Sequence, residues 1–118
     1  MDTKDFNELL DYVVDEKIRG VLKKKADEYT RGDRLSNFKE AARISKVTPL
    51  RALRGMQIKH DVSIMDLTDD FDKGTFNTWE MWLEKVTDRI NYDILALALV
   101  KEAMLLDKLI QESKPNKP

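Results

Sequence analysis

The chain has 118 residues, of which 42% are hydrophobic and 36% are charged, and its formal net charge is −1. This length is enough for one domain with a modest core but not for two, and the near-neutral charge argues against a general nucleic-acid-binding protein. The absence of Cys excludes disulfides, thiolate metal sites and cysteine catalysis, and the single His excludes a multi-histidine metal site.

The first predicted helix begins near Thr3 or Asp5, because apolar residues recur at helical spacing from there on. Gly20 indicates a bend or a break in it. Residues 31–33 (Arg-Gly-Asp) indicate its end, since Gly just past a basic last turn is typical of a helix C-terminus. A short connecting helix is expected at about 35–44. The apolar positions of the first helix are Phe6, Leu9, Leu10, Val13 and Val14, continued by Ile18, Val21, Leu22 and Tyr29.

Thr48 and Pro49 predict the start of the next helix, with Thr as the N-cap and Pro at the first helical position. We expect this helix to end near Leu67. Residues 68–77 are polar and rich in turn-forming residues, which predicts a loop.

Asn77 and Glu80 resemble a capping box at the start of the longest helix, which is expected to span about 78–112. One apolar stripe of this helix predicts a buried face, and further apolar residues on its other sides require more than one burying partner. We therefore expect a homodimer or a larger homo-oligomer. The stripe consists of Trp79, Leu83, Val86, Ile90, Ile94 and Leu97, and the further apolar residues include Leu95, Leu99, Val100 and Leu106.

No segment alternates in the manner of a β-strand. The sequence thus predicts an all-α fold, a helical bundle of about four main helices plus the short connecting helix. Residues 1–112 are expected to form a single domain, and residues 113–118 a disordered tail. No apolar run approaches the roughly eighteen residues of a membrane span, and the acidic N-terminus does not resemble a signal peptide, so we expect a soluble, cytoplasmic protein without a membrane partner.

The most informative part of the long helix is the pair Glu84 and Asp88, whose spacing of four residues places both carboxylates on one helical face. Carboxylates beside a packed surface need a cation or several hydrogen bonds, and a divalent metal is one such cation. Asn91 lies one turn further along, where it would orient a water molecule or a ligand, or else bond to a neighbouring helix. The alternative for the two acids is an ordinary charged flank, paired with Lys85, Arg89 or another helix.

Three further side chains suit contact with a phosphorylated ligand, and each has a structural alternative. Lys59 would contact phosphate, or else form a salt bridge with the acidic pair. Arg34 would contact phosphate and Asn37 a base edge, whereas the neighbouring Asp33 would simply cap the next helix. His60 is expected to be a structural hydrogen-bonding residue rather than a catalyst.

Four aromatic side chains offer stacking surfaces for a nucleobase, although aromatic residues at helical spacing mostly belong to the core. Phe38 and Trp79 are expected in the core. Trp82 is the third of these four aromatic residues. Tyr92 lies opposite the main stripe of its helix and is expected to meet a second helix or a partner subunit.

Three blocks of residues, in order along the chain, resemble a group of small phage and prophage proteins. The likeness covers roughly residues 21–102, which is most of the chain. The blocks are Tyr29 with Asp33-Arg34-Leu35-Ser36-Asn37-Phe38-Lys39; Thr48-Pro49, Ala52-Leu53, Gly55-Met56 and Lys59-His60-Asp61-Val62-Ser63-Ile64; and Trp82, Glu84-Lys85, Asp88 and Asn91-Tyr92.

This group is similar to phage domains associated with nucleotide modification, and beyond them to the all-α nucleoside triphosphate pyrophosphohydrolases of the MazG and dimeric dUTPase type. The resemblance implies a protein of the bacterial host's cytoplasm that binds a nucleotide. In those enzymes acidic side chains from two facing helices bind Mg²⁺, and the metal holds the triphosphate while water attacks. Glu84 and Asp88 match the outer acids of the family's E-E-x-x-D signature, which implies Mg²⁺ on these two side chains.

The chain departs from that family at two points. Lys85 stands where the second Glu of the signature falls. For the other acidic pair, E-x-x-E, the candidates are Asp11 with Asp15 or Asp27 with Glu28, and neither has the form of the pattern. These departures favour an alternative, a non-enzymatic helical phage accessory or interaction module on the same scaffold.

Overall fold

The computed structural model describes residues 1–28 and 32–115, and the side chains of all of these except residues 26–28. Within this part of the chain no strand occurs, so the predicted all-α fold with a long C-terminal helix is confirmed there. Tyr29 and Arg31, which entered the predicted end of the first helix, and residues 116–118 of the predicted tail lie outside it. The elements are α1 (Thr3–Tyr12), the π-helical segment η1 (Val13–Arg19), α2 (Gly20–Glu28), α3 (Ser36–Ser45), α4 (Pro49–Asp72) and α5 (Trp79–Ser113).

α1, η1 and α2 form one continuous N-terminal helix. It begins at Asp2, whose carboxylate accepts a hydrogen bond from the backbone N–H of Asp5 (2.7 Å). Gly20 has ordinary helical geometry (φ −60°) and its N–H donates to the C=O of Asp15, so the predicted bend or break at this glycine is wrong. The irregularity lies just before it, in the wider turns of η1.

Asp33 organises the turn into α3. Its carboxylate accepts a hydrogen bond from the N–H of Leu35 (2.9 Å), and its C=O accepts one from the N–H of Ser36 (3.1 Å). Gly32, just before it, has a φ of 75°, which glycine adopts without strain. The N-cap position of α3 is Leu35, without a side-chain cap, so the prediction that Asp33 caps the helix is wrong and Asp33 instead forms a turn that leads into it.

α4 begins as predicted, with Pro49 first and the hydroxyl of Thr48 accepting a hydrogen bond from a first-turn N–H (3.2 Å). It runs on to Asp72, so the first half of the predicted loop at 68–77 is helical instead. Thr68 does not break the helix, because its hydroxyl donates to the C=O one turn earlier (2.8 Å).

The cap of α5 is Thr78, whose hydroxyl accepts a hydrogen bond from the N–H of Met81 (3.1 Å). The predicted cap at Asn77 is wrong by one residue. Asn77 adopts a φ of 60° in the connecting turn, a conformation that Asn tolerates well, and its side-chain amide donates to the carboxylate of Asp70 (3.1 Å). α5 ends at Ser113, so the first residue of the predicted tail is still helical.

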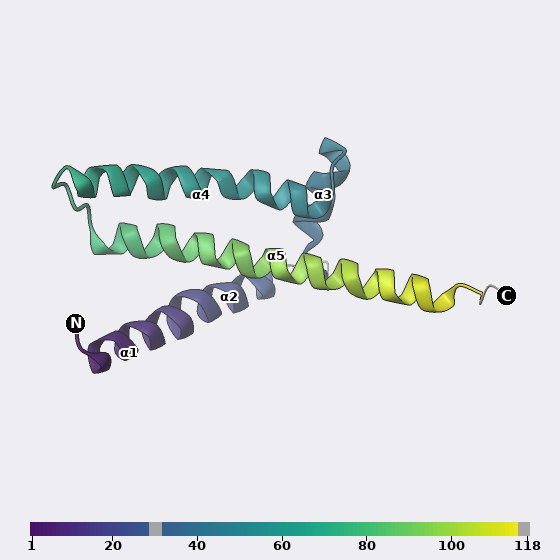
Figure 1. Ribbon diagram of the computed structural model, residues 1–118, viewed down its shortest axis with the longest axis horizontal. Coiled ribbons are helices and arrows are strands. Elements are labelled where there is room, and N and C mark those ends of the chain that lie inside the picture. The colour runs from purple at the N-terminus through teal and green to yellow at the C-terminus, as the bar shows by residue number, and fades with distance from the viewer. Residues whose placement is uncertain (29–31, 116–118) are drawn as a thin grey trace.

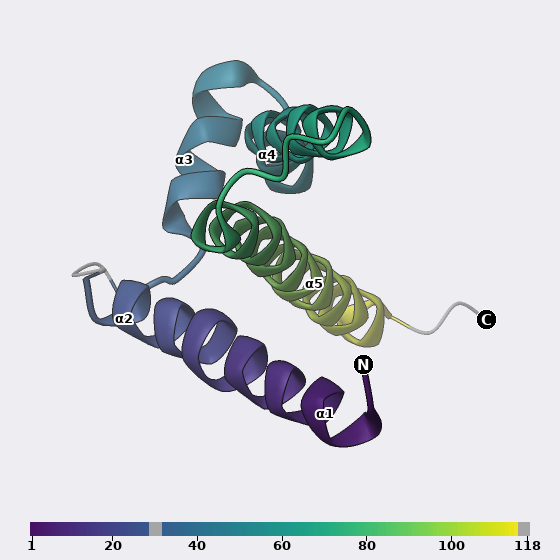
Figure 2. The ribbon, with the colours of Figure 1, turned by 90° about the vertical axis from the view of Figure 1, so that its left-hand side faces the viewer.

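α4 and α5 form an antiparallel hairpin, and α3 crosses it near the start of α4 (Figures 1 and 2). The core lies at this crossing. Leu53 of α4 is completely buried there against side chains from the other two helices. Phe38, predicted in the core, is confirmed. The buried cluster consists of Leu35, Phe38, Leu53, Ala96 and Leu99.

Two polar contacts join α4 to α5 beside this core. The guanidinium Nε of Arg89 lies 3.0 Å from a carboxylate oxygen of Asp61. The amide of Gln57 donates to Asp93 (2.7 Å), and Arg54 lies 3.3 Å from the same oxygen. Half-exposed ion pairs contribute little free energy, so their effect is mainly to hold the register between the two helices.

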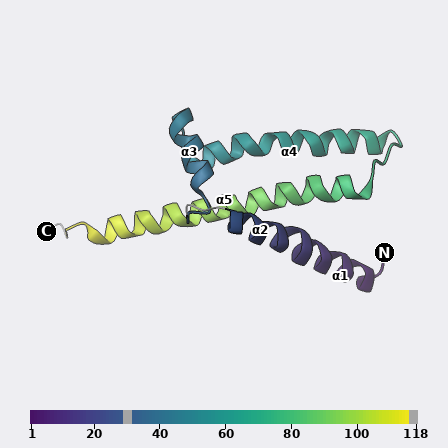
Figure 3. The same cartoon turned by 180° about the vertical axis from the view of Figure 1, so that it is seen from behind.

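The N-terminal helix lies on the other side of α5 and diverges from it toward its own N-terminus (Figures 2 and 3). It contacts α5 through η1. Trp79, the first residue of α5, is 56% exposed because α1 has already diverged at this point, so its predicted place in the core is wrong. None of the helices described combines the length and apolar character needed to cross a lipid bilayer.

Replacing Leu53 by Ala should lower the free energy of unfolding by about 2–5 kcal/mol, because a large side chain in a closed core leaves a cavity when it is truncated. Urea denaturation followed by circular dichroism measures the change. Ile58→Ala is the matched control, since Ile58 lies on the same helix and is exposed. Equal losses in the two variants would contradict the position of the core.

Candidate functional site

A cavity of about 570 Å³ lies between α2, α3, α4 and α5. Glu84 does not line it, but lies with Asp88 along a neighbouring hollow of about 340 Å³ that faces η1. Asp88 borders both spaces and so connects the acidic pair to the larger cavity. Five of the six side chains that the sequence assigned to a site line the larger cavity: Arg34, Asn37, Lys59, Asp88 and Asn91.

Asn91 is almost completely buried, with 6% of its surface exposed. Its side-chain oxygen has no hydrogen-bond partner among the residues that the structure describes. A buried acceptor without a donor destabilises a protein by about 1–3 kcal/mol, so such groups usually serve a ligand or a water molecule. The bond to a neighbouring helix that would have explained Asn91 structurally is not made by this oxygen within the described chain.

Aromatic side chains form one wall of the cavity. The rings of His60 and Tyr92 are tilted against each other with centroids 4.9 Å apart, and Tyr92 and Phe38 form an edge contact with centroids 6.3 Å apart. The prediction that Tyr92 meets a second helix is confirmed, since its partners lie on α3 and α4. His60 packs within this wall.

Arg34 and Asn37 reach the cavity from the start of α3, and a chain of charges fixes that start against α5. The ammonium of Lys39 lies 2.7 Å from Asp33 and 2.6 Å from Glu102. The hydrogen bond from Lys39, followed by the one from the N–H of Leu35, lowers the pKa of Asp33 below its usual value. The hydrogen bonds to Asp33 and then Glu102 raise the pKa of Lys39.

Lys59 lies exposed at the rim of the cavity. Among the described residues it forms no salt bridge with Glu84 or Asp88, and these two acids pair with no cation. Arg89, considered as their partner, is paired with Asp61 instead. The structural alternatives that the sequence offered for these charges are therefore not observed in this part of the chain.

The carboxylates of Glu84 and Asp88 suit a metal ion that is also held by a phosphorylated ligand better than one held by the protein alone. No group of three or more His, Asp or Glu side chains is placed to hold a metal within the described residues. Lys17 of η1 lines the same hollow as the two acids. Mg²⁺ commonly takes one or two carboxylates and completes its shell with waters and phosphate oxygens, which two carboxylates can satisfy. The side chains of Asp27 and Glu28 lie outside the described residues.

Sequence reasoning missed several lining residues. Lys25 of α2 adds a third cationic side chain to the cavity, and Met56 and Leu95 supply apolar surface. No local pattern marks these residues. They become neighbours only through the crossing of the helices.

Comparison of the chain with protein-family models, curated proteins and solved structures finds no match.

Replacing Asn91 by Leu should leave the free energy of unfolding unchanged or raise it by about 1 kcal/mol, because the variant removes a buried acceptor that lacks a donor. Denaturation with urea in ligand-free buffer measures this. A loss of more than about 1 kcal/mol would mean that Asn91 is a structural hydrogen-bonding residue.

The Asp33–Lys39 pair makes stability depend on pH. A lowered carboxyl pKa means that the folded state favours the ionised form, so the stabilisation is present above the unfolded value of about 4 and is lost as the pH falls through the folded value. Asp33→Asn should thus be less stable than the parent at pH 7, and the difference should shrink below about pH 4. Melting temperatures of both proteins between pH 7 and pH 2.5 test this, and a constant difference would contradict it.

Proposed function

We propose that this protein binds a nucleoside triphosphate together with Mg²⁺ in the cavity between α2, α3, α4 and α5 and hydrolyses it to a nucleoside monophosphate and pyrophosphate. The observation that supports this best is the convergence of two cations, two amides and a carboxylate on one cavity, with an unpartnered oxygen on the most buried amide. These residues are Arg34, Lys59, Asn37, Asn91 and Asp88.

The dimensions and chemistry of the cavity suit a nucleotide. Its volume of about 570 Å³ falls in the range of small-molecule sites, roughly 300–1,000 Å³. Arg34 and Lys59 bind phosphate oxygens, Arg by a fork of donors and Lys as a point charge. Tyr92 offers an aromatic surface to the base, and Asn91 accepts a hydrogen bond from a base amino group.

Glu84 and Asp88 are the residues that would hold Mg²⁺, beside the phosphates. When bound, the metal neutralises charge on the phosphates and lowers the pKa of an attached water. Asn37 lines the cavity from α3, where it contacts the base or sugar.

A second candidate is an interaction module that binds the nucleotide without hydrolysing it. Lys17 in the same hollow as the acids and Lys85 beside Glu84 both favour this alternative, because a hydrolase of the MazG type concentrates carboxylates at its metal site. Pyrophosphate release separates the two candidates. From the resemblance to the MazG-like phage proteins, we also propose that the protein acts in the cytoplasm of a bacterial host.

We also propose that the protein acts as a homo-oligomer. The second half of α5 exposes large apolar side chains, which a second copy would cover.

A triphosphate with Mg²⁺ at about one hundred times its Kd should raise the free energy of unfolding by about 2.7 kcal/mol and the melting temperature by roughly 10 °C. The double variant Glu84→Gln/Asp88→Asn should lose this shift and keep its helical fold. The control Asp107→Asn/Glu112→Gln makes the same chemical change on the exposed end of the same helix and should keep the shift. Thermal unfolding against ribo- and deoxyribonucleoside triphosphates, with and without Mg²⁺, provides the measurement.

Three outcomes are distinct. A shift that survives in the Glu84/Asp88 variant would mean that the metal residues are wrongly assigned. A shift without pyrophosphate release from any triphosphate would favour the interaction module. The absence of a shift with every nucleotide would refute the nucleotide site.

A further inference from the structure

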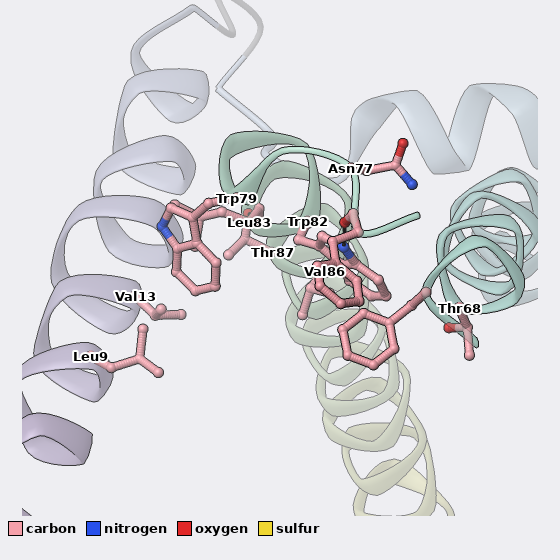
Figure 4. A pocket seen from close by; sticks show the side chains of 11 residues that line it. Leu9, Val13, Thr68, Asn77, Trp79, Trp82, Leu83, Val86 and Thr87 are labelled. Carbon is pink, nitrogen blue, oxygen red and sulfur yellow. Dashed lines mark hydrogen bonds between the residues drawn. The ribbon is translucent and has the colours of Figure 1, made fainter. Parts of the chain in front are cut away.

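A second, apolar cavity of about 660 Å³ lies where α1 diverges from α5. It shares no lining residue with the proposed nucleotide cavity. Figure 4 shows Leu9 and Val13 of the N-terminal helix on one side, with Trp79, Leu83 and Val86 of α5 across from them. We call this space the α1–α5 groove.

The other end of α5 presents exposed apolar side chains. Figure 1 shows the second half of α5 running on past α3 and α4. Leu97 is 69% exposed there and Met104 is 67% exposed. Side chains of this kind need a partner, since contiguous exposed apolar surface is uncommon in monomeric proteins.

One line of residues connects the two ends. Along α5, Trp79, Leu83, Val86 and Ile90 are followed by Asp93, Leu97, Val100 and Met104, separated alternately by four and three residues. This is the spacing of a coiled-coil seam, so all eight residues share one face. We call this line the α5 seam. Trp79, Leu83 and Val86 of this seam line the α1–α5 groove. Leu97, Val100 and Met104 are exposed, whereas Asp93 between the two halves contacts Gln57 of α4.

The α5 seam is self-complementary when it is reversed. Its steps read four, three, four, three, four, three, four from either end. An antiparallel second copy therefore matches every position, with Leu97 of the second copy opposite Val86 and Met104 of the second copy opposite Trp79. The same contact then forms twice about a two-fold axis, as in an isologous dimer.

The surface area of the chain is consistent with a missing partner. Its accessible surface is 9264 Å², whereas a compact protein of 13.8 kDa exposes roughly 6,600 Å². Its radius of gyration is 18.7 Å, against about 13.5 Å for a compact domain of this length. The excess surface exceeds the roughly 800 Å² per partner that a stable interface buries.

We propose that the α1–α5 groove is the seat of a second copy of this chain, whose α5 lies antiparallel along the α5 seam, so that α1, α4 and the two α5 helices form a four-helix bundle at each end of the dimer. This arrangement rests on the self-association in the proposed function and does not depend on nucleotide binding.

The absence of Cys in the chain allows a direct test of the register. The variant Val86→Cys/Leu97→Cys should form a covalent dimer with a short bismaleimide linker, because the two positions face each other between copies. Within one helix they are roughly 16 Å apart and cannot be joined by it. The control Val86→Cys/Met104→Cys displaces the pair by one heptad, roughly 10 Å, and should not cross-link. Cross-linking of Val86→Cys alone would indicate a parallel pair and overturn the arrangement.

Light scattering and sedimentation test the association itself. The parent should be a dimer, and Leu97→Asp should weaken it at least about 100-fold by placing a charge in the interface. Ile58→Asp, at a comparably exposed site on α4, should leave the dimer intact. A monomeric parent would refute both self-association and the arrangement. A dimer that resists Leu97→Asp, or that cross-links only in the control pair, would refute the arrangement alone.

Discussion

The contact of Leu53 with Ala96 and Leu99 is the constraint on which the rest of the molecule depends. It fixes the rotation of α5 about its own axis, and each residue of a helix is turned by about 100° from the one before. With Ala96 and Leu99 against α4, Asp88 and Asn91 border the polar cavity, whereas Val86 lines the α1–α5 groove and Leu97 is exposed. One packing contact therefore separates a polar surface from an apolar one on the same helix.

The two surfaces differ in how they depart from an ideal folded chain. Around the polar cavity, the departure is the buried amide oxygen of Asn91, which has no donor among the described residues and lies beside packed aromatic rings. Along the α5 seam, the departure is a large area of apolar side chain in contact with water. The folding of a single chain explains neither feature. A monomer would be more stable if the amide oxygen had a donor and the apolar side chains were covered.

Much of the fold could be predicted from the sequence, because the helices carry local signals. Thr48 with Pro49 gave the start of α4 correctly, and apolar periodicity gave the extent of α5. The errors occurred where a local preference competed with a tertiary contact. Thr68 resembled a turn residue but bonds within its helix, and Asn77 resembled a cap but occupies the turn.

The residues of the candidate site could be predicted from the sequence, but the burial of each side chain could not. Glu84, Asp88 and Asn91 share a helical face by spacing alone, yet Asn91 is buried and Glu84 is exposed. The difference arises because different elements cover the two turns of α5, which no local pattern records. The exposure of Trp79 has the same origin, since it depends on the direction in which α1 leaves α5.

The faces that the N-terminal helix presents have a cause in the backbone. In η1 the N–H of Gly20 reaches back five residues to Asp15, where an α-helix reaches back four. The extra residue resets the phase of the helix, so the faces of α1 and α2 are not continuous with each other. The N-terminal helix can therefore turn one face toward the polar cavity through α2 and a different face toward the groove through α1. Loss of one residue between Asp15 and Arg19 would restore a single phase and rotate α1 by about 100° relative to α2, although none of these residues lines the groove or the polar cavity.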